Sequence, residues 1–456
     1  MYRGVVWLAR RSTRWFYRNH ELLNESAIPH TGATLLVASH GNDLPDILLT
    51  FLTTKRRIRF VANVAAADSI IVQWVYSRIG VIPVARTRDA RAAIARGKDV
   101  VALNSRAFAS VTAAFKRGEC VAIFPEGVVN DFPHLSPMRT GAARMALDAL
   151  AAGVPNLSVV AIGHQYEDPQ IPRTDYLTVI GAPIRVENWR ASVPQRAVSE
   201  FTRVIKKELQ ELTRNSATYA DAAKLSAIAA AIGAVTCTAN KSPLVCSHEA
   251  QIAITNAQSR HGLFVSASST SAPPEIELEN AAAVLTNRVS RFGVRPRSSY
   301  DHAIALRAAG DLSAVMPFPS VARLVALAPV AIAGWIWHAV PMWGCHALGK
   351  RFAPLAVEVS ARTIVPGLYL IALWYVTIPL VLLWAGTTRW LVLLLFLVQP
   401  RLGDVALRWR DELRTRLLIS RVQRAPTVDR QGIVSGANEL RRLWASLPWR
   451  EALSHE

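Results

Sequence analysis

The segment VASHGNDLPDILL contains two side chains that together can move a proton. His40 follows an apolar run, and Asp46 stands six positions later, behind a proline. A carboxylate that accepts a hydrogen bond from one ring nitrogen of a histidine fixes the tautomer, so that the other nitrogen can act as a general base. The alternative is structural, because Asp43 is a suitable N-cap for a helix beginning at Leu44, and an acid in the first turn is favoured by the helix dipole. Taken alone, the segment leaves both interpretations open.

Two other segments place charged side chains after apolar runs. The tripeptide Pro-Glu-Gly at 125–127 follows the run CVAIF, and Arg86 follows the run GVIPVA. A glutamate at the end of a buried strand needs a partner, and glycine permits close backbone approach or a positive φ. A guanidinium can hold a phosphate through two parallel hydrogen bonds. The structural alternatives are an ordinary strand-to-loop turn and a solvated arginine.

Short apolar runs surround these residues and alternate with helical patterns. The runs are typical of strands buried on both faces, and they cover 34–39, 58–64, 80–86, 120–124, 157–164 and 176–184. Segments 68–79 and 139–153 have the pattern of helices, and Gly153 ends the second. Alternation of this kind predicts an α/β domain over residues 31–190, with a mixed and mostly parallel sheet covered by helices.

Composition restricts the class of partner. Lys and Arg number 52 against 33 Asp and Glu, and the net charge of +19 suits an anionic partner such as an acidic lipid headgroup, a polyphosphate or nucleic acid. The basic residues are scattered and match no nucleic-acid-binding motif, so we expect no nucleic acid partner. The four cysteines have neither zinc nor redox spacing, which predicts free thiols, a reducing compartment and no metal site.

Two long segments contain no charged residue and are predicted to cross a membrane. They cover 324–349 and 364–388, and about 20 apolar residues are enough for one span. The short loop between them makes a transmembrane hairpin, with tryptophans near its ends. The run WLVLLLFLVQP at 390–400 is too short to cross alone and is interpreted as re-entrant or interfacial. Buried helices of a soluble core are the alternative.

The remaining parts of the chain are predicted to be helical. Arginines flank an apolar stripe near the start, so residues 1–30 are interpreted as an amphipathic helix on the membrane surface, with a packing helix as the alternative. Residues 191–320 are predicted to be a helical insert with a Ser/Thr/Pro linker at 266–274. The membrane hairpin is assigned to 321–400 and a basic helical tail to 401–456.

Four motifs in a fixed order resemble a known superfamily. His-x5-Asp is followed by Gly-Val-Ile-Pro-Val-x-Arg, by Phe-Pro-Glu-Gly and by the apolar strand VVAIGHQY, and this order resembles the glycerolipid acyltransferases. Within them the chain looks most like the fungal-type glycerol-3-phosphate/dihydroxyacetone-phosphate acyltransferases. That similarity rests on KRRIRFV at 55–61, LSPMRTGAARMAL at 135–147 and the hairpin far downstream.

The resemblance implies a role for each matching residue. His40 matches the general base, Asp46 the acid that orients it, and Arg86 the arginine that holds the acceptor phosphate. The loop that binds the acceptor matches Phe124, Pro125, Glu126 and Gly127. The implied reaction moves a fatty acyl group from acyl-CoA directly to the sn-1 hydroxyl of glycerol 3-phosphate or dihydroxyacetone phosphate, with no further cofactor, in phospholipid and triacylglycerol biosynthesis.

Three departures from the family pattern leave alternatives open. Most members have four residues between the His and the Asp, where this chain has five, so Asp43 is a rival partner for His40. Residues 128–131, Val-Val-Asn-Asp, lack the usual hydroxyl or basic residue, and Asn63 stands where fungal-type members often have a lysine.

The alternative functions are acyl transfer to lysophosphatidate or another lysolipid, and a membrane lipid-binding scaffold without catalysis. The implied location is the endoplasmic reticulum membrane in a eukaryote or the cytoplasmic membrane in a bacterium.

Overall fold

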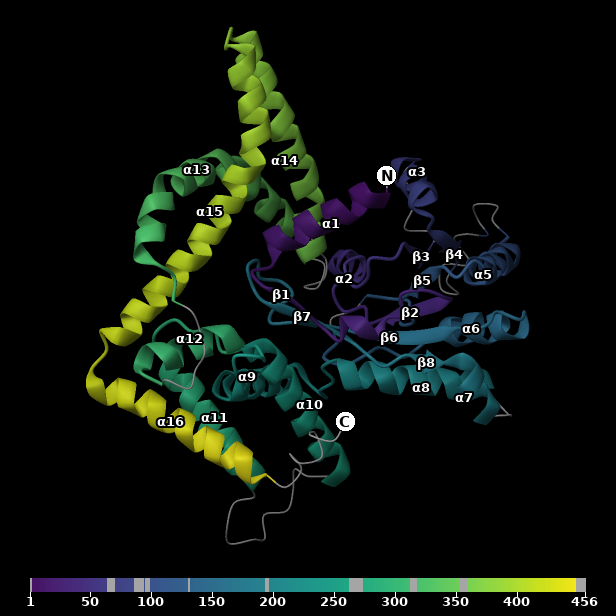
Figure 1. Cartoon of the computed structure of the whole chain (residues 1–456), viewed down its shortest axis with the longest axis horizontal. Coiled ribbons are helices and arrows are strands. Elements are labelled where there is room, and N and C mark those ends of the chain that lie inside the picture. Colours follow the sequence, from purple (N-terminus) through teal and green to yellow (C-terminus); the bar gives the residue numbers. More distant parts are fainter. Residues whose placement is uncertain are drawn as a thin grey trace. The chain divides into compact units, whose positions relative to one another are not determined.

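The computed structural model describes residues 2–63, 70–85, 94, 99–129, 132–192, 197–261, 274–311, 318–352 and 359–447 (Figure 1). The chain divides into two compact units. Unit 1 comprises residues 1–14, 20–165 and 177–215, and unit 2 comprises residues 15–19, 166–176 and 216–456. The predicted linker at 266–274 falls outside the described residues, apart from Pro274.

Unit 1 is built on a sheet with the strand order β1-β7-β6-β2-β5-β3-β4, and β8 pairs with β6. The pairs β6–β2, β2–β5, β5–β3 and β3–β4 are parallel, whereas β8 is antiparallel to β6. The predicted fold, a mixed and mostly parallel sheet covered by helices, is confirmed. The strands are β1 His20–Leu23, β2 Thr34–Ala38, β3 Ile58–Asn63, β4 Ile82–Val84, β5 Cys120–Ile123, β6 Ser158–Tyr166, β7 Tyr176–Ile180 and β8 Ile184–Arg185. The helices are α1 Tyr2–Phe16, α2 Leu44–Thr50, α3 Ile70–Ile79, α5 Val100–Lys116, α6 Gly141–Ala151, α7 Val186–Ser192 and α8 Ala197–Leu212, with a short 3₁₀ turn at Glu25–Ala27.

Helices cover both faces of the sheet because the central strands are apolar on both faces. Along β2, Leu35 and Val37 belong to a core cluster with side chains of α5, α6 and α8. Leu36 and Ala38 belong to a second cluster, which includes Ala9 of α1. Alternate residues of a strand point to opposite faces, so one apolar strand supplies two cores. Of the candidate site residues, His40 follows the end of β2 and Glu126 follows the end of β5.

The predicted strands all occur in the structure, with one interruption. The run at 176–184 is divided into β7 and β8, and the residues between them include Gly181 and Pro183. Proline cannot donate a ladder hydrogen bond, which favours a break at this point. Sequence reasoning missed β1, a four-residue strand at the edge of the sheet whose sequence HELL lacks a clear strand pattern.

The helix at the start of the chain uses its apolar stripe for packing. Ala9 is fully buried, and Val5 packs partly buried against the same cluster on the sheet. Trp7 lies off that stripe, and 65% of its surface is exposed. The packing interpretation therefore describes the stripe, and contact with a membrane surface stays a prediction.

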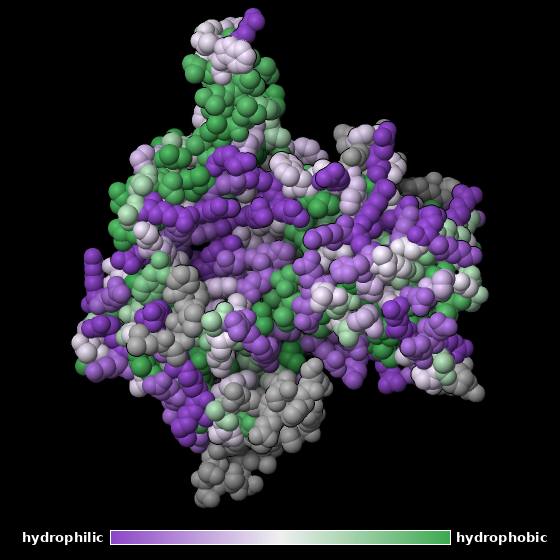
Figure 2. All heavy atoms as spheres, in the orientation of Figure 1, coloured by the Kyte–Doolittle hydropathy of each residue, from purple (hydrophilic) through white to green (hydrophobic). Residues whose placement is uncertain are grey.

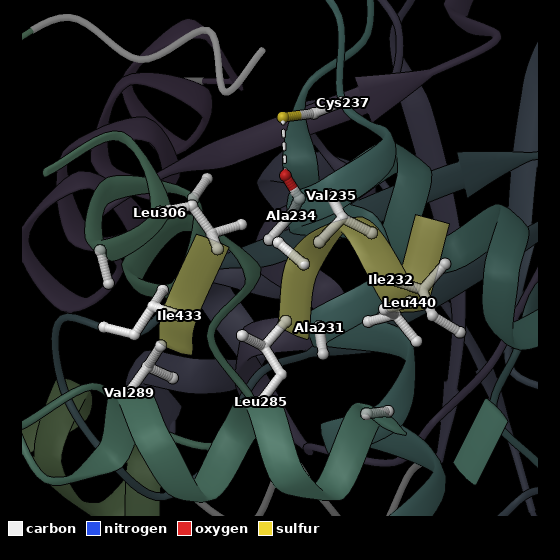
Figure 3. Close-up of a cluster of buried hydrophobic side chains, with 14 of the residues drawn as sticks. Ala231, Ile232, Ala234, Val235, Cys237, Leu285, Val289, Leu306, Ile433 and Leu440 are labelled. Carbon is white, nitrogen blue, oxygen red and sulfur yellow. Dashed lines mark hydrogen bonds between the residues drawn. The ribbon is translucent and has the colours of Figure 1, made fainter. Parts of the chain in front are cut away.

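Unit 2 is helical in the part of the chain that the structure describes. Its first four helices, the last part of α15 (Arg389–Gln423) and α16 (Thr427–Ser446) form a core. In it α9 (Tyr219–Thr236) is buried on most of its circumference, as expected for a helix that is apolar all round. Figure 3 shows this core, with labelled side chains Ala231, Ile232, Val235, Leu285, Val289, Leu306, Ile433 and Leu440 turned toward one another. The helices are α9 Tyr219–Thr236, α10 Pro243–His261, α11 Pro274–Ser290, α12 Ser299–Ala309, α13 Val321–Phe352, α14 Val359–Trp384, α15 Arg389–Gln423 and α16 Thr427–Ser446.

Three of the described helices, α13, α14 and α15, are long and apolar enough to cross a membrane. Figure 2 shows apolar surface over the arm formed by α14 and α15, which run side by side in Figure 1. Two of these helices correspond to the predicted spans. The run at 390–400 differs from its prediction, because it is the first part of the 35-residue α15, which continues through Pro400 into a charged segment.

A buried ionic network also lies in unit 2. Asp301 of α12 accepts hydrogen bonds from three guanidiniums, at 2.8 Å from Arg18, 3.0 Å from Arg295 and 3.0 Å from Arg414. Burial alone would raise the pKa of Asp301, but the three arginines bring it well below its usual value. Burial, together with repulsion from a nearby aspartate, raises the pKa of Glu167 to about 7.

Candidate active site

The carboxyl ends of two neighbouring parallel strands bring the first and third motifs together. β2 ends at Ala38 and leads to His40, while β5 ends at Ile123 and leads to Glu126. The backbone N–H of His40 donates a hydrogen bond of 2.7 Å to Oε1 of Glu126. Segments that are 86 residues apart in the chain thus meet at one sheet edge, which is the usual place for a site in an open α/β sheet.

His40 is paired with Asp46. Nδ1 of the imidazole lies 3.2 Å from Oδ2 of Asp46, and the same oxygen accepts the backbone N–H of Asn42 at 2.7 Å. Both side chains are buried. Asp46 stands in the first turn of α2, after Pro45. The two interpretations offered by the sequence therefore coincide, since one carboxylate is both a first-turn acid and the partner of the histidine.

Asp43, the rival partner, has a different position. It occupies the N-cap of α2 with φ of 45°, and its side chain makes no capping hydrogen bond to the helix. The imidazole contact that the structure records is to Asp46. Asn63 is the last residue of β3 and is buried. Arg86 lies outside the described residues, so its predicted contact with the acceptor phosphate stays a prediction.

Glu126 is almost fully buried, and both of its carboxylate oxygens are used within the protein. Oε1 accepts the N–H of His40 at 2.7 Å, and Oε2 accepts the N–H of Ser136 at 2.9 Å. Burial raises the pKa of Glu126, while these two backbone hydrogen bonds oppose the rise. The partners that a buried glutamate requires are thus two backbone N–H groups from two loops. Through one of them Glu126 fixes the backbone at His40.

The other residues of the Phe-Pro-Glu-Gly motif shape the same corner. The ring of Phe124 stacks on the imidazole of His40, with centroids 4.2 Å apart and an angle of 22° between the planes. The carbonyl of the buried Pro125 accepts the N–H of Arg139 at 2.8 Å. Gly127 has φ of +68°, a conformation that a side chain disfavours. Of the two roles that the sequence offered for this glycine, close backbone approach or a positive φ, the structure shows the positive φ.

His164 stands in the fourth motif, whose strand at 158–164 resembles the block tied to acyl-donor binding, but sequence reasoning did not name it as a site residue. It lies on β6, which is parallel to β2, and its backbone N–H donates to Ser39 Oγ at 3.0 Å. Nε2 lies 3.1 Å from Thr50 Oγ1 and Nδ1 lies 3.3 Å from Thr178 Oγ1. Thr50 itself donates to the backbone carbonyl of Asp46 at 2.7 Å. One sequence feature could have identified it: a histidine stands at the end of the apolar run LSVVAIGH, which ends at the same sheet edge.

The hydroxyl contact with Thr50 defines which ring nitrogen of His164 carries a hydrogen in its neutral form. Because Thr50 donates its hydrogen to Asp46, its oxygen is left to accept from Nε2–H of His164, and Nδ1 then accepts from Thr178. Complete burial lowers the pKa of His164 to about 4, an effect that Asp46 opposes. A neutral, buried imidazole is therefore linked through Thr50 to the backbone of Asp46.

The geometry provides one proton acceptor held in a fixed tautomer. Nδ1 of His40 faces Asp46, so Nε2 is the ring nitrogen left for substrate chemistry. A hydrogen-bonded acid behind a histidine is the arrangement of a general base. Among the described residues, no three His, Cys, Asp or Glu side chains are grouped as metal ligands.

Comparisons with known proteins agree with this arrangement. Residues 19–164, which span the His–Asp motif, β5 and β6, match the family model Acyltransferase. The resemblance to the glycerolipid acyltransferase superfamily, predicted from the four motifs, is confirmed.

Two individual proteins show similarity to parts of the chain. Glycerol-3-phosphate O-acyltransferase 2 of Saccharomyces cerevisiae is 33% identical over 121 residues, which make up 25% of this chain and 16% of the yeast protein. The crystal structure of the 1-acyl-sn-glycerophosphate (LPA) acyltransferase PlsC from Thermotoga maritima aligns with a TM-score of 0.35 and 16% identity, over 46% of this chain and 78% of that one. The chain thus spans only a small part of the length of its yeast relative.

Proposed function

We propose that this acyltransferase domain transfers a fatty acyl group from acyl-CoA to the sn-1 hydroxyl of glycerol 3-phosphate or dihydroxyacetone phosphate. The observation that carries the proposal is the pairing of His40 with Asp46 at the edge where Glu126 also lies. The partial similarity to yeast glycerol-3-phosphate O-acyltransferase 2 supports this class of acceptor. The product would enter phospholipid and triacylglycerol biosynthesis.

The chemistry needs a base, an alcohol and a thioester. Nε2 of His40 takes the hydroxyl proton while the oxygen forms a bond to the thioester carbonyl carbon. The tetrahedral oxyanion then collapses, the carbon–sulfur bond breaks, and the thiolate of CoA receives the proton from the imidazolium. General base action of this kind contributes about 10²–10⁴-fold, and holding the two substrates together contributes further. No acyl-enzyme intermediate is required.

The acceptor phosphate is assigned to Arg86, and Phe124, Pro125 and Gly127 shape the acceptor loop. The structure gives Glu126 two backbone partners, so we assign it to positioning His40 within that loop. Helices α13, α14 and α15 are proposed to insert in a lipid bilayer, since each is long and apolar enough to cross one. The acyl donor would then be bound, and the lipid product released, at the membrane.

The proposal is tested by acyl transfer from purified full-length protein. With acyl-CoA and glycerol 3-phosphate, we expect His40→Ala to lower kcat by about 10²-fold or more, because the general base is removed. His134→Ala, which changes an exposed histidine of the same unit, should retain the activity. Near-normal turnover of the His40 variant would exclude the mechanism.

A panel of acceptors decides among the remaining functions. Glycerol 3-phosphate, dihydroxyacetone phosphate, lysophosphatidate and another lysolipid are each offered with one acyl-CoA. Preferential acylation of the first two supports the proposal, whereas preference for lysophosphatidate assigns the lysolipid activity. Binding of an acceptor without product at long incubation would instead identify a lipid-binding scaffold, an outcome that the unusual residues Val128 and Val129 motivate.

A further inference from the structure

A pocket of about 280 Å³ lies within unit 2, between α13 and α15. Its wall is rich in large apolar side chains and includes Trp15, Trp335, Trp343 and Leu407. Among the described residues of its lining, Arg410 of α15 contributes the one charged side chain. The pocket belongs to none of the motifs of the acyltransferase domain, so it requires a separate account.

Two polar side chains of the pocket wall already have partners in the protein. The imidazole of His338 contacts the backbone carbonyl of Gly334 at 2.7 Å and the hydroxyl of Tyr375 at 2.8 Å. The indole N–H of Trp15 donates to Asp404 at 3.0 Å. With these groups satisfied, the wall offers mainly apolar surface, and an apolar ligand segment suits it.

Arg410 is the exception, because its charge has no counterpart. Among the described residues it makes no hydrogen bond or ion pair, and its side chain is exposed. Three charged residues that follow it on α15 are paired: Asp411 with Arg173, Glu412 with Arg323 at 3.1 Å, and Arg414 with Asp301 at 3.0 Å. An anion on the ligand would supply the missing charge, since a guanidinium binds phosphate through charge-assisted hydrogen bonds.

The position of the pocket along α15 indicates where the ligand comes from. Residues 390–400 of this helix are uncharged, and Arg401 begins the charged part, in which Gly403 and Arg410 line the pocket. If α15 inserts as proposed above, the pocket lies at the level of the lipid headgroups. Trp343 is exposed by 75% and lies close to the end of the apolar segment of α13 at Cys345, and tryptophans near the end of a span are typical of that level.

We propose that this pocket binds an anionic phospholipid of the surrounding bilayer. One acyl chain enters the apolar space and the phosphate contacts Arg410. The volume of about 280 Å³ is slightly below the range of about 300–1,000 Å³ that whole small molecules occupy, so it holds a segment of one chain and not a complete lipid. The proposal rests on membrane insertion of α13–α15 and is independent of the acyl transfer reaction.

Photo-crosslinking of full-length protein in nanodiscs tests the proposal without requiring activity. Phosphatidylcholine discs contain a trace of phosphatidic acid, or of phosphatidylcholine, with a photoactivatable acyl chain, and labelled peptides are identified by mass spectrometry. We expect phosphatidic acid to label the peptides around 335–343 and 403–410 at least five-fold more than phosphatidylcholine. Excess unlabelled phosphatidic acid should remove this labelling, and excess phosphatidylcholine should not.

Two variants and a control separate the headgroup from the chain. Arg410→Gln should abolish the preference for phosphatidic acid, and because Arg410 is exposed and unpaired, the variant should fold normally. Arg408→Gln, a matched change of an exposed arginine outside the pocket lining, should keep the preference. Ala339→Trp, which fills the pocket from α13, should reduce labelling by both probes. Equal labelling by the two lipids in wild type, or a preference unaffected by Arg410→Gln, would overturn the proposal.

Discussion

Two buried carboxylates hold the backbone and the ring of His40 from different directions. Asp46 contacts the imidazole from the first turn of α2, and Glu126 accepts the backbone N–H from the loop after β5. Each carboxylate oxygen of Glu126 is engaged by one backbone N–H, from His40 and from Ser136. At the scale of single residues, the division of roles is therefore one acid for the ring and one for the loop.

Replacement of Glu126 by glutamine tests that division. A glutamine amide has only one acceptor oxygen, so its NH₂ group would face one of the two N–H donors of His40 and Ser136. Loss of a hydrogen bond to a charged group costs about 1.5–3 kcal/mol, and we expect kcat to fall about 10–100-fold with little change in KM for the acceptor. Steady-state kinetics of Glu126→Gln measures both quantities.

The control for this change is Glu119→Gln. Glu119 is a partly exposed glutamate directly before β5 that pairs with Arg59 and Arg117 at the surface, and surface ion pairs contribute little. Its kinetics should remain close to wild type. A large rise in acceptor KM at constant kcat for the Glu126 variant would instead mean that this glutamate contacts the acceptor.

His164 makes the stability of unit 1 depend on pH. Its pKa falls from 6.5 to about 4 on folding because the ring is completely buried. The unfolded chain therefore binds a proton at a higher pH than the folded one, and stability is lost as pH falls from 6.5 toward 4. The shift corresponds to about 3 kcal/mol. The free energy of unfolding of His164→Gln, measured with urea, should lack this part of the pH dependence. The difference in unfolding free energy between wild type and variant should therefore shrink at low pH.

The exposed His134 provides the matched comparison for that experiment. His134→Gln removes an imidazole that is exposed in the structure, and its unfolding free energy should follow the wild-type pH profile. If His164→Gln and wild type show parallel profiles between pH 6.5 and 4, the buried imidazole is not the titrating group.

At the scale of elements, close packing of α13 on α15 depends on a glycine. A Cβ built at Gly334 would collide with the backbone carbonyl of Leu402, and the ring of His338 packs against Gly403 on the same pair of helices. Small residues allow apolar helices to approach closely where no hydrophobic effect drives them together. The wall of the lipid pocket is formed by this helix pair.

Gly334→Val should therefore separate the two helices. Overpacking of this kind costs about 1–3 kcal/mol, and we expect a lower midpoint of thermal unfolding in detergent. Ala333→Val adds the same kind of side-chain bulk to an exposed neighbour on α13 and should leave the midpoint unchanged. Equal midpoints for wild type and the Gly334 variant would show that the helices can adjust without cost.

At the scale of the whole molecule, the two units are stabilised by different means. Unit 1 has an apolar core on each face of its sheet, whereas unit 2 combines an apolar helical core with the ion network around Asp301. Removing one partner of a buried ion pair leaves the other charges uncompensated, at a cost of about 3–5 kcal/mol. The ion network is thus a determinant of stability specific to unit 2.

Asp301→Asn should destabilise unit 2 selectively. Three guanidiniums would lose their shared carboxylate, and we expect hydrogen exchange to accelerate in α12 while β2 and β5 keep their protection. Asp429→Asn, a change at an exposed aspartate of α16, is the control. Because the pKa of Asp301 is lowered on folding, its contribution is present at neutral pH and is lost as pH falls below about 4. Unchanged exchange in α12 would refute this assignment.

The sequence by itself determined the sheet, the apolar helices and the identity of the motifs. Apolar runs bounded by Gly and Pro are local signals that predict strands and helices, and the order of the motifs indicated the family. The sequence could not decide whether Asp46 or Asp43 is the partner of His40. The answer depends on the direction in which α2 follows the strand and on the φ of 45° at Asp43. The partners of Glu126 and the inclusion of His164 depended on which strands are neighbours. Strand order brings distant chain segments together, and only the tertiary structure decides it.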